Sequence, residues 1–367
     1  MSLAKPTAHN VSVIGYGLSA RIFHIPLILS VPGLRLHSIV QRHPKPGNDA
    51  REDFRDVRWF GAVEEALRDG EVDVVVVCTV PEAHFEVVKG ALERGKHVVV
   101  EKPFTTTVKE ADELIALAKK HSRLLTVYHN RRWDSDFLTL QNLLRTHTLG
   151  RIASFSTHFD RHRPNPPPST SWKSRPSPAN SAIYDLGTHL IDQAVVLFGM
   201  PAKITGFLGS QREGGGGVED SCSVVLQWEG GLVGRVEVGV VSLEVEQARY
   251  WVRGTEGTLR KYHLDPQEDQ LKAGKRPGDP GFGVEPPDRY GTLTTLSPTT
   301  NLPTRTTYPT ISPPATYTEF YRLFAKALAG EGEVPVRPEE ARDVICLVEL
   351  ARESSRVGRT LDVDLSV

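Results

Sequence analysis

The sequence has few features that would set the protein apart from ordinary globular enzymes and binding proteins. It contains three cysteines, Cys78, Cys222 and Cys346, which lie far apart and form no C-x-x-C pair and no metal-binding spacing. Such scattered cysteines favour buried free thiols in a reducing compartment, and no metal site is expected. No stretch approaches the roughly 20 apolar residues that a membrane-spanning helix needs.

An excess of positive charge is also missing, since 44 Lys and Arg residues face 45 Asp and Glu residues. Proteins that bind nucleic acids usually carry a basic excess or stripe, so we expect no such partner. The first ten residues, MSLAKPTAHN, lack the charged-then-apolar pattern of a secretory signal, and the last six, DVDLSV, match no retention or lipidation signal. A cytoplasmic protein with a small-molecule ligand is therefore expected, without a membrane partner.

What the sequence does contain is a regular alternation of strand-like and helix-like segments over residues 1–130. A chain of 367 residues exceeds the usual size of one hydrophobic core, so two domains are expected. Strands are predicted at 11–15, 34–40, 72–79, 97–103 and 124–130, and the clearest helices at 82–95 and 108–121. This alternation predicts right-handed βαβ crossovers and a doubly wound parallel sheet, which is an α/β fold.

The pattern changes in residues 131–367. After a linking helix at 131–149, strand-like runs follow one another with few helices, which predicts an α+β domain with a mainly antiparallel sheet. The runs lie at 152–163, 221–228, 233–245 and 248–262, and helices are expected near 183–198, 316–330 and 338–356. The stretch 285–314 is rich in Pro and Thr and is predicted to be a surface loop.

A glycine motif follows the first predicted strand directly and precedes a helical segment. The motif is G-x-G-x-x-A, formed by Gly15, Tyr16, Gly17, Leu18, Ser19 and Ala20. The first glycine permits a tight turn, the second lets the backbone approach a pyrophosphate, and the small third residue lets helix and strand pack closely. A glycine turn alone is common, but in this βαβ context the motif predicts dinucleotide binding at a helix N-terminus.

The end of the second strand indicates which dinucleotide is preferred. NAD-binding sites usually place an Asp or Glu there, whereas this sequence has Arg42 after Gln41. An arginine can hold the 2′-phosphate of NADP through forked, charge-assisted hydrogen bonds. NADP is therefore preferred over NAD, and the alternative is that Arg42 is a solvated surface cation.

Ligands in open parallel sheets bind outside the carboxyl ends of the strands, so residues at these ends are further candidates. Those predicted to contact the cofactor are Thr79, Val80, Pro81, His84, Glu101, Lys102, Asn130 and Arg132. Lys102 could stabilise charge on a substrate oxygen, or it could simply be a surface lysine that ends a strand.

A second cluster lies on the predicted helix near 183–198, where Asp185 and His189 are four residues apart and share one face. In this apolar helix they could be a satisfied structural pair, or a base with a carboxylate that orients it or binds substrate. The residues alone leave both possibilities open.

The combination of GYGLSA, EKP at 101–103 and D-x-x-x-H at 185–189 resembles the glucose–fructose oxidoreductase/inositol dehydrogenase/MocA family of NAD(P)-dependent oxidoreductases. Similarity extends to FHIPLI (23–28), YHNRRWDSDFLTL (128–140) and THFDRHRP (157–164), and is closest to the NADP-dependent scyllo-inositol dehydrogenase subgroup. The resemblance implies a Rossmann domain followed by a substrate-binding domain with an open sheet. It also implies that Lys102, Asp185 and His189 are catalytic and that the Lys102–Pro103 peptide is cis.

The resemblance further implies hydride transfer between NADP and a secondary alcohol of a cyclic polyol or sugar. Residues expected to bind the substrate are Lys102, Arg161, Trp172, Asp185 and His189. The Pro- and Ser-rich segment 164–182 departs from the family pattern, so Trp172, Lys173 and Arg175 could alter specificity. A dinucleotide-binding regulator without turnover, or a reductase of a non-sugar carbonyl or imine, remains an alternative. The open sheet makes a homodimer or higher homo-oligomer plausible.

Overall fold

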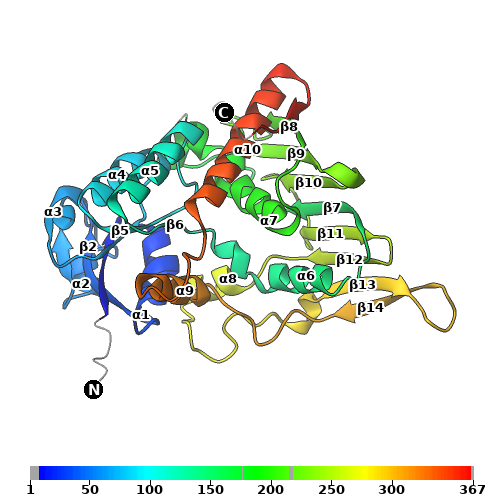
Figure 1. Ribbon diagram of the computed structural model, residues 1–367, viewed down its shortest axis with the longest axis horizontal. Coiled ribbons are helices and arrows are strands. Elements are labelled where there is room, and N and C mark those ends of the chain that lie inside the picture. The colour runs from blue at the N-terminus through cyan, green and yellow to red at the C-terminus, as the bar shows by residue number, and fades with distance from the viewer. Residues whose placement is uncertain (1–7, 176, 215–217, 365–367) are drawn as a thin grey trace. The chain divides into compact units, whose positions relative to one another are not determined.

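The computed structural model describes residues 8–175, 177–214 and 218–364, and these form two compact units (Figure 1). The first unit comprises Met1–Asn130, Gln267–Phe282 and Ala315–Arg342, and the second comprises Arg131–Pro266, Gly283–Pro314 and Asp343–Val367. The sequence-based division also fell after residue 130, but it assigned 267–282 and 315–342 to the second domain. These two segments instead pack with the first unit.

The first unit contains a six-stranded parallel sheet with the order β3-β2-β1-β4-β5-β6. Its strands are β1 (His9–Ile14), β2 (Leu34–Val40), β3 (Arg58–Phe60), β4 (Val74–Val77), β5 (His97–Val100) and β6 (Leu125–Val127). The valines of β4 and β5 are buried on both faces of the sheet, as expected for the centre of a parallel sheet that helices cover. The predicted doubly wound fold is confirmed.

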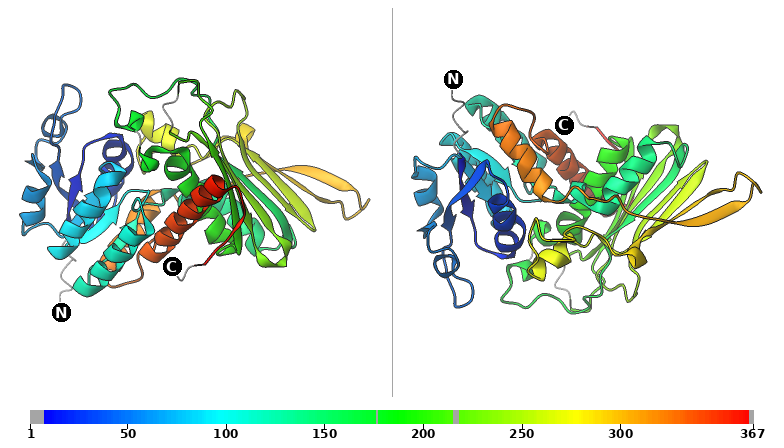
Figure 2. Two further views of the ribbon diagram at one scale, coloured as in Figure 1. Left: turned by 90° about the horizontal axis from the view of Figure 1, so that it is seen from above. Right: turned by 90° about the horizontal axis from the view of Figure 1, so that it is seen from below.

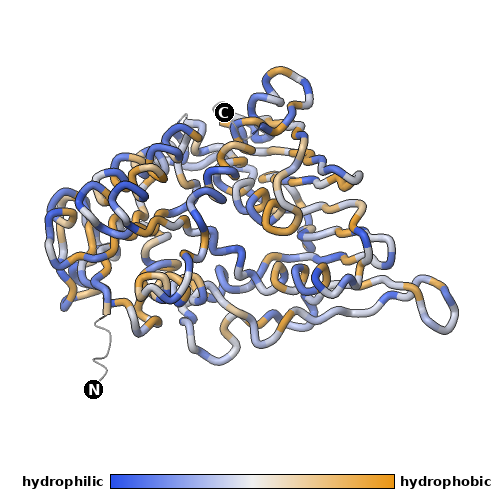
Figure 3. Tube along the Cα trace, in the orientation of Figure 1, coloured by the Kyte–Doolittle hydropathy of each residue, from blue (hydrophilic) through white to orange (hydrophobic). Residues whose placement is uncertain are grey.

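The helices of this unit begin and end at local signals in the sequence. In α5 (Val108–His121), Thr107 and Glu110 form a capping box, and Ser122 ends the helix in the left-handed conformation. Hydrophobic and hydrophilic stretches alternate along α4 (His84–Glu93) and α5, because one face of each helix is buried (Figure 3). The others are η1 (Ala20–His24), α1 (Ile25–Leu29), α2 (Ala50–Asp53), α3 (Val63–Arg68), η2 (Pro81–Ala83), α8 (Gln267–Lys272) and α9 (Thr318–Leu328).

The second unit contains a nine-stranded sheet with the order β14-β13-β12-β11-β7-β10-β9-β8-β15. Its neighbours are antiparallel except for β7 and β10, which pair in parallel. The strands are β7 (Ile152–His158), β8 (Lys203–Gly209), β9 (Ser221–Gln227), β10 (Val233–Val238), β11 (Ala248–Gly254), β12 (Gly257–Tyr262), β13 (Gly291–Leu296), β14 (Pro303–Tyr308) and β15 (Leu361–Asp362). The predicted α+β domain with a mainly antiparallel sheet is confirmed.

Helices lie against one face of this sheet (Figure 2). They include α7 (Thr188–Phe198), the π-helical turn η6 (Ile183–Gly187) that precedes it, and the part of α10 (Pro338–Val357) that belongs to this unit. The packing is close at Gly206 in β8, where an added Cβ would lie 2.1 Å from the carbonyl oxygen of Ala351 in α10. Another helix of the unit, α6 (Ser135–Arg145), lies earlier in the chain and follows the 3₁₀ turn η3 (Asn130–Trp133).

One prediction was wrong. The stretch 285–314 was expected to be a surface loop, but it contains β13 and β14, which form an antiparallel hairpin. The side chains of β14 are nearly all exposed, so the strand has no buried face that would produce an alternation of apolar and polar residues. Within the described residues, no helix combines the length and the apolar character that crossing a membrane requires.

Candidate functional site

The glycine loop of the first unit has the backbone geometry that its motif requires. Gly15 has a φ of 98°, and a Cβ at this position would lie 2.6 Å from the carbonyl oxygen of Cys78 at the end of β4. Gly17 is different, since a Cβ there would meet nothing within 4 Å. The loop thus leaves open space beside Gly17, where a dinucleotide pyrophosphate would approach the backbone, and buries Ala20 completely against the strand. These features fit a bound dinucleotide.

The other members of the loop have distinct surroundings. The Tyr16 hydroxyl donates a hydrogen bond of 2.6 Å to Asp53 in α2, so this side chain, which is 5% exposed, ties the loop to the neighbouring helix. Leu18 is 61% exposed, which leaves its side chain accessible to a ligand. Arg42 lies just beyond β2 and is exposed, and the loop that follows it is held by two hydrogen bonds of Gln41, to Asn48 and Ala50.

Glu101, the residue after β5, connects the glycine loop to Lys102. One carboxylate oxygen accepts hydrogen bonds from the Ser19 hydroxyl and from Nε2 of His24, the latter at 2.9 Å. The other accepts the backbone N–H of Lys102 at 3.0 Å. Nδ1 of His24 lies 2.5 Å from the hydroxyl of Tyr321 in α9. The Glu101 side chain is 12% exposed, so these contacts occur in the protein interior.

This arrangement keeps the Glu101 carboxylate ionised. Burial alone would raise its pKa, but the hydrogen bond and charge of His24, the Lys102 charge and the Ser19 hydroxyl lower the pKa from 4.5 to about 2. Because the folded-state pKa lies below the ordinary value, the carboxylate stabilises the folded protein above about pH 4.5. That contribution is lost as the pH falls from about 4.5 towards 2.

The neighbouring strand ends lie close together. His84, at the start of α4, is completely buried, and its ring nitrogens lie 2.9 Å from the carbonyl oxygen of Pro103 and 3.3 Å from that of Thr79. Burial lowers the pKa of this ring, and its neutral form would donate to one of these two carbonyl oxygens. Pro81 is also buried, whereas Thr79 and Val80 are partly exposed. The Lys102–Pro103 peptide is cis, which confirms that prediction.

In the second unit, Asp185 and His189 belong to two kinds of helix. Asp185 lies in the π-helical turn η6, and His189 is the second residue of α7. The wider turn changes the simple four-residue spacing that the sequence suggested, and such turns occur frequently at functional sites. The Asp185 side chain is 35% exposed and forms an ion pair of 2.8 Å with Lys173.

Lys173 reaches Asp185 from the Pro- and Ser-rich segment 164–182, of which residue 176 is outside the described residues. Its ammonium group also lies over the ring of Trp172, 5.4 Å from the centroid. Asn180 donates hydrogen bonds of 3.0 Å to the carbonyl oxygens of Trp172 and Arg175, which fold the segment back towards η6. A cation from this segment therefore lies against a proposed catalytic carboxylate.

His189 is 6% exposed and lies beside an aromatic and cationic group. Its ring centroid is 6.5 Å from that of Phe159, just beyond β7. The guanidinium groups of Arg131 and Arg161 lie over the same Phe159 ring, at 4.7 and 4.6 Å from the centroid. The structure thus brings Arg161, a predicted substrate-binding residue, to the same aromatic ring as His189.

A buried network fixes the next turn of α7. Arg132 binds Asp192 with two nitrogens, at 2.9 Å from Nε and 2.6 Å from Nη2. The completely buried Arg249 of β11 donates to Gln193 at 2.9 Å and to Asp136 at 2.9 Å. Arg132, predicted to contact the cofactor, is therefore paired with α7. Asn130, at the end of the first unit, is 7% exposed. Removing one partner of the buried Arg132–Asp192 pair would cost about 3–5 kcal/mol of folding free energy.

Sequence reasoning missed the roles of His24, Tyr321 and Arg249. His24 lies within FHIPLI, one of the similar segments, but its partners Glu101 and Tyr321 are 77 and 297 residues away in the chain. A lone histidine in an apolar segment gives no signal of such distant partners. Arg249 lies in a strand-like run, where the alternation of exposed and buried side chains did not reveal that its charge is buried.

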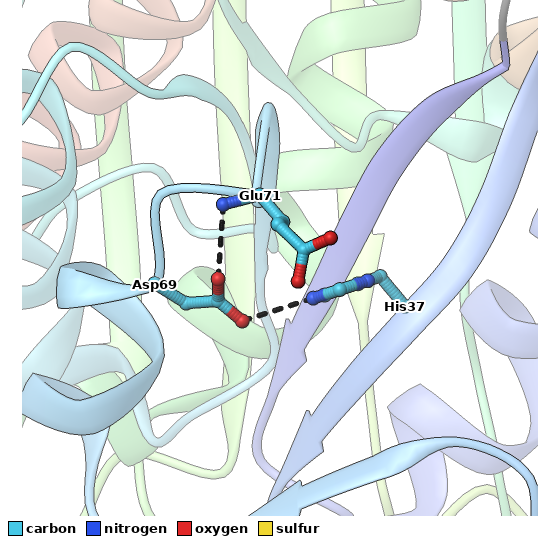
Figure 4. Close-up of side chains that lie close together, drawn as sticks. All are labelled: His37, Asp69 and Glu71. Carbon is cyan, nitrogen blue, oxygen red and sulfur yellow. Dashed lines mark hydrogen bonds and ion pairs between the residues drawn. The ribbon is translucent and has the colours of Figure 1, made fainter.

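His37, Asp69 and Glu71 form another cluster, in the first unit away from the glycine loop (Figure 4). His37 lies 2.9 Å from Asp69, which also accepts the backbone N–H of Glu71. Arg58 binds both carboxylates, at 3.0 Å for Asp69 and 2.5 Å for Glu71. The guanidinium supplies the positive charge that a metal ion would bring, so we interpret the cluster as an ion-pair network.

Two family models match the chain. The NAD-binding Rossmann fold of an oxidoreductase family matches residues 9–129, and the C-terminal alpha/beta domain of the same family matches residues 141–364. Together these matches cover most of the chain, and they fall on either side of the boundary between the two units at residue 130.

Individual relatives are similar over almost their whole length. The chain is 39% identical to the uncharacterized oxidoreductase YdgJ of Escherichia coli, with 96% of this chain and 97% of the relative covered. It is 34% identical to the scyllo-inositol 2-dehydrogenase (NADP(+)) IolW of Bacillus subtilis, with 96% and 95% covered. The solved structure of the oxidoreductase yvaA from Bacillus subtilis superposes with a TM-score of 0.91 at 33% identity, covering 98% and 100%.

Proposed function

The chain belongs to the glucose–fructose oxidoreductase/inositol dehydrogenase/MocA oxidoreductase family, and from this premise we propose that it is an NADP-dependent dehydrogenase of a cyclic polyol or sugar. The observation that carries the proposal is that Lys102, Asp185 and His189 all occur in a chain matched over 96% of its length by an NADP-linked scyllo-inositol dehydrogenase. When bound, the nicotinamide accepts or supplies the hydride, which is the part of the reaction that side chains cannot perform.

The chain's own residues would bind the cofactor and move the proton. The glycine loop from Gly15 to Ala20 would hold the pyrophosphate at the N-terminal end of the helical segment that begins with η1. Arg42 is exposed beyond β2, where it would pair with the 2′-phosphate, and this supports NADP over NAD.

His189 would take the proton from the substrate hydroxyl as the general base. Lys102 would stabilise the alkoxide that forms or pass the proton on. Asp185 would hold a neighbouring hydroxyl or orient the base, and its partial exposure supports contact with a substrate. Arg161 and Trp172 would contribute to substrate binding, because Arg161 shares the Phe159 ring with His189 and Trp172 contacts the Lys173 ammonium group.

A fluorescence titration with NADPH and NADH, followed by nicotinamide absorbance with a panel of substrates, tests the proposal. The panel should contain inositols, aldoses and non-sugar carbonyl compounds. Oxidation of a polyol or sugar with NADP supports the proposed dehydrogenase. Binding of NADPH without turnover of any compound would favour a regulator, and turnover confined to non-sugar carbonyls or imines would favour the reductase.

We also propose that the chain forms a homodimer or higher homo-oligomer through the face of the nine-stranded sheet opposite α7 and α10. This face has a hollow of about 1020 Å³ whose lining includes Phe207, Glu237 and Trp251. Phe207 is 64% and Trp251 42% exposed, and large exposed apolar side chains on one sheet face are typical of an interface. Light scattering of the wild type and of Trp251→Glu tests this proposal, since the variant should lower the molar mass.

A further inference from the structure

The contacts of Glu101 show how the glycine loop and Lys102 are held in position relative to each other. Ser19 belongs to the loop, and the backbone N–H of Lys102 belongs to the residue proposed to act on the substrate. Both bind the same carboxylate. A change in the position or charge of this carboxylate would therefore affect the glycine loop and Lys102 at the same time.

The side chain of His24 contacts the Glu101 carboxylate through its Nε2 atom. It is completely buried at the end of the π-helical turn η1, and its ring centroid lies 4.3 Å from that of Tyr128, with the ring planes tilted by 45°. Burial raises the pKa of Tyr321, and its hydroxyl lies 2.5 Å from Nδ1 of His24, a contact that holds the imidazole ring in place. Because an ionised carboxylate can only accept, Nε2 of His24 is the donor in its contact with Glu101.

We propose that His24 is a positioning residue for cofactor binding and catalysis: fixed by Tyr321, it orients the Glu101 carboxylate, which in turn holds Ser19 of the glycine loop and the backbone of Lys102. The role rests on the proposed function, because it concerns the loop that would bind NADP. It is not implied by the motif residues, since both His24 and Tyr321 lie outside the glycine motif, EKP and D-x-x-x-H.

A variant such as His24→Leu lacks the N–H group that donates to Glu101, and its cofactor binding should become more sensitive to pH. Glu101 would stay buried but lose the donor that favours its ionised form, so its pKa should rise and the carboxyl should take up a proton in mildly acidic solution. A protonated carboxyl is a poorer acceptor for Ser19 and for the N–H of Lys102, which would loosen the loop. The cofactor affinity should then fall as the pH decreases.

The other titratable side chains around Glu101 are the same in the wild type and in His24→Leu, so they do not account for a difference between the two profiles. They are Cys78, His84, Lys102, Tyr128 and Tyr321. Burial raises the pKa of the Cys78 thiol and of both tyrosines, so these three groups stay neutral as the pH falls from about 8, and it lowers the pKa of His84. The 2′-phosphate of NADPH itself takes up a proton at about pH 6, so the part of the acidic limb that His24→Leu adds to the wild-type profile reports on Glu101.

The test is a fluorescence titration with NADPH from about pH 8 to pH 5 for wild type, His24→Leu and His24→Gln. The wild type should show only the pH dependence that protonation of the 2′-phosphate of NADPH at about pH 6 produces. For His24→Leu we expect the dissociation constant to rise roughly tenfold at pH 8 and further as the pH falls. The amide of His24→Gln can still donate to Glu101, so this variant should restore the wild-type profile.

His37→Leu is the matched control, because His37 also lies 2.9 Å from a carboxylate in the first unit but does not contact the loop. It should leave NADPH binding and its pH profile unchanged. If His24→Leu does not fold, Tyr321→Phe removes only the hydroxyl that holds the His24 ring and should shift the profile in the same direction by a smaller amount.

The outcomes separate the two proposals. A wild-type protein that binds neither NADPH nor NADH would refute the proposed function and this inference together. Normal wild-type binding with an unchanged affinity and pH profile in His24→Leu, or in Tyr321→Phe when His24→Leu is unfolded, would overturn the inference alone. An acidic limb in His37→Leu equal to that of His24→Leu would also overturn it, because the effect would then be a general loss of packing.

Discussion

Two carboxylates lie beside the proposed catalytic residues, and their surroundings differ sharply. Glu101 precedes Lys102 and is 12% exposed. Its carboxylate accepts hydrogen bonds from Ser19, His24 and the backbone N–H of Lys102. Asp185 lies shortly before His189, is 35% exposed and pairs with the partly exposed Lys173. The first carboxylate has its hydrogen-bonding capacity engaged inside the protein, whereas the second is partly exposed to solvent.

The difference teaches that adjacency to a catalytic candidate does not by itself define a role. A buried, ionised carboxylate with several donors acts on the positions of its neighbours, because moving it would leave an uncompensated charge in the interior. A surface ion pair is weak, with a median of about 0–1 kcal/mol, so Lys173 can exchange Asp185 for water or substrate at little cost.

The largest effect is expected for Lys102→Ala. The turnover number should fall by about 10²–10³-fold, because the variant loses the cation that stabilises charge on the substrate oxygen. Affinity for NADPH should change little, since the backbone N–H that binds Glu101 is retained. Steady-state kinetics and a fluorescence titration measure the two quantities, and Lys109→Ala, at an exposed lysine, is the control. Near-normal turnover would remove Lys102 from the catalytic set.

Asp185→Asn and Glu101→Gln compare the two carboxylates directly. Asp185→Asn should lower kcat/KM about 30-fold and leave NADPH affinity unchanged, since a charge-assisted hydrogen bond to substrate is weakened. Glu101→Gln should instead weaken NADPH binding roughly tenfold, because Ser19 and the N–H of Lys102 lose a charged acceptor. Kinetics with the cofactor and the second substrate varied in turn measure both parameters. If both variants changed the same parameter, the proposed difference between the two carboxylates would be wrong.

Arg42→Ala should affect one cofactor and spare the other. We expect NADPH affinity to fall about tenfold through loss of the charge-assisted bonds to the 2′-phosphate, while NADH affinity stays the same. The two dissociation constants, measured by fluorescence, form an internal control. Arg35→Ala, on the same strand but bound to Asn10, should change neither. Equal weakening of both cofactors would mean that Arg42 does not recognise the phosphate.

The smallest effect is expected for Lys173→Met, which removes the charge of an exposed ion pair. The Michaelis constant for the sugar or polyol should change about two- to fivefold, with kcat and NADPH affinity nearly unchanged. Comparison of neutral and acidic sugars would sharpen the result, because the loss of a cation should act differently on the two. A large fall in kcat would indicate that Lys173 fixes Asp185 rigidly and would weaken the contrast with Glu101.

Much of the first unit was predictable because its signals are local. The helix at 108–121 matches α5 in both limits, since a capping box and a left-handed residue define its ends. The strand at 34–40 matches β2. The hairpin of β13 and β14 was missed because its Thr- and Pro-rich strands expose most side chains, and nothing in their composition distinguishes them from a loop.

The sequence by itself determined the resemblance to the family, the alternation of strands and helices in residues 1–130, the glycine loop and the motif residues Lys102, Asp185 and His189, because each depends on short motifs or on periodicity along the chain. Tertiary structure alone decided that Glu101 is held by His24 and Tyr321, that Lys173 reaches Asp185, and that 267–282 and 315–342 pack with the first unit. These features join residues far apart in the chain, and a single sequence carries no pattern that records which distant side chains share a buried charge.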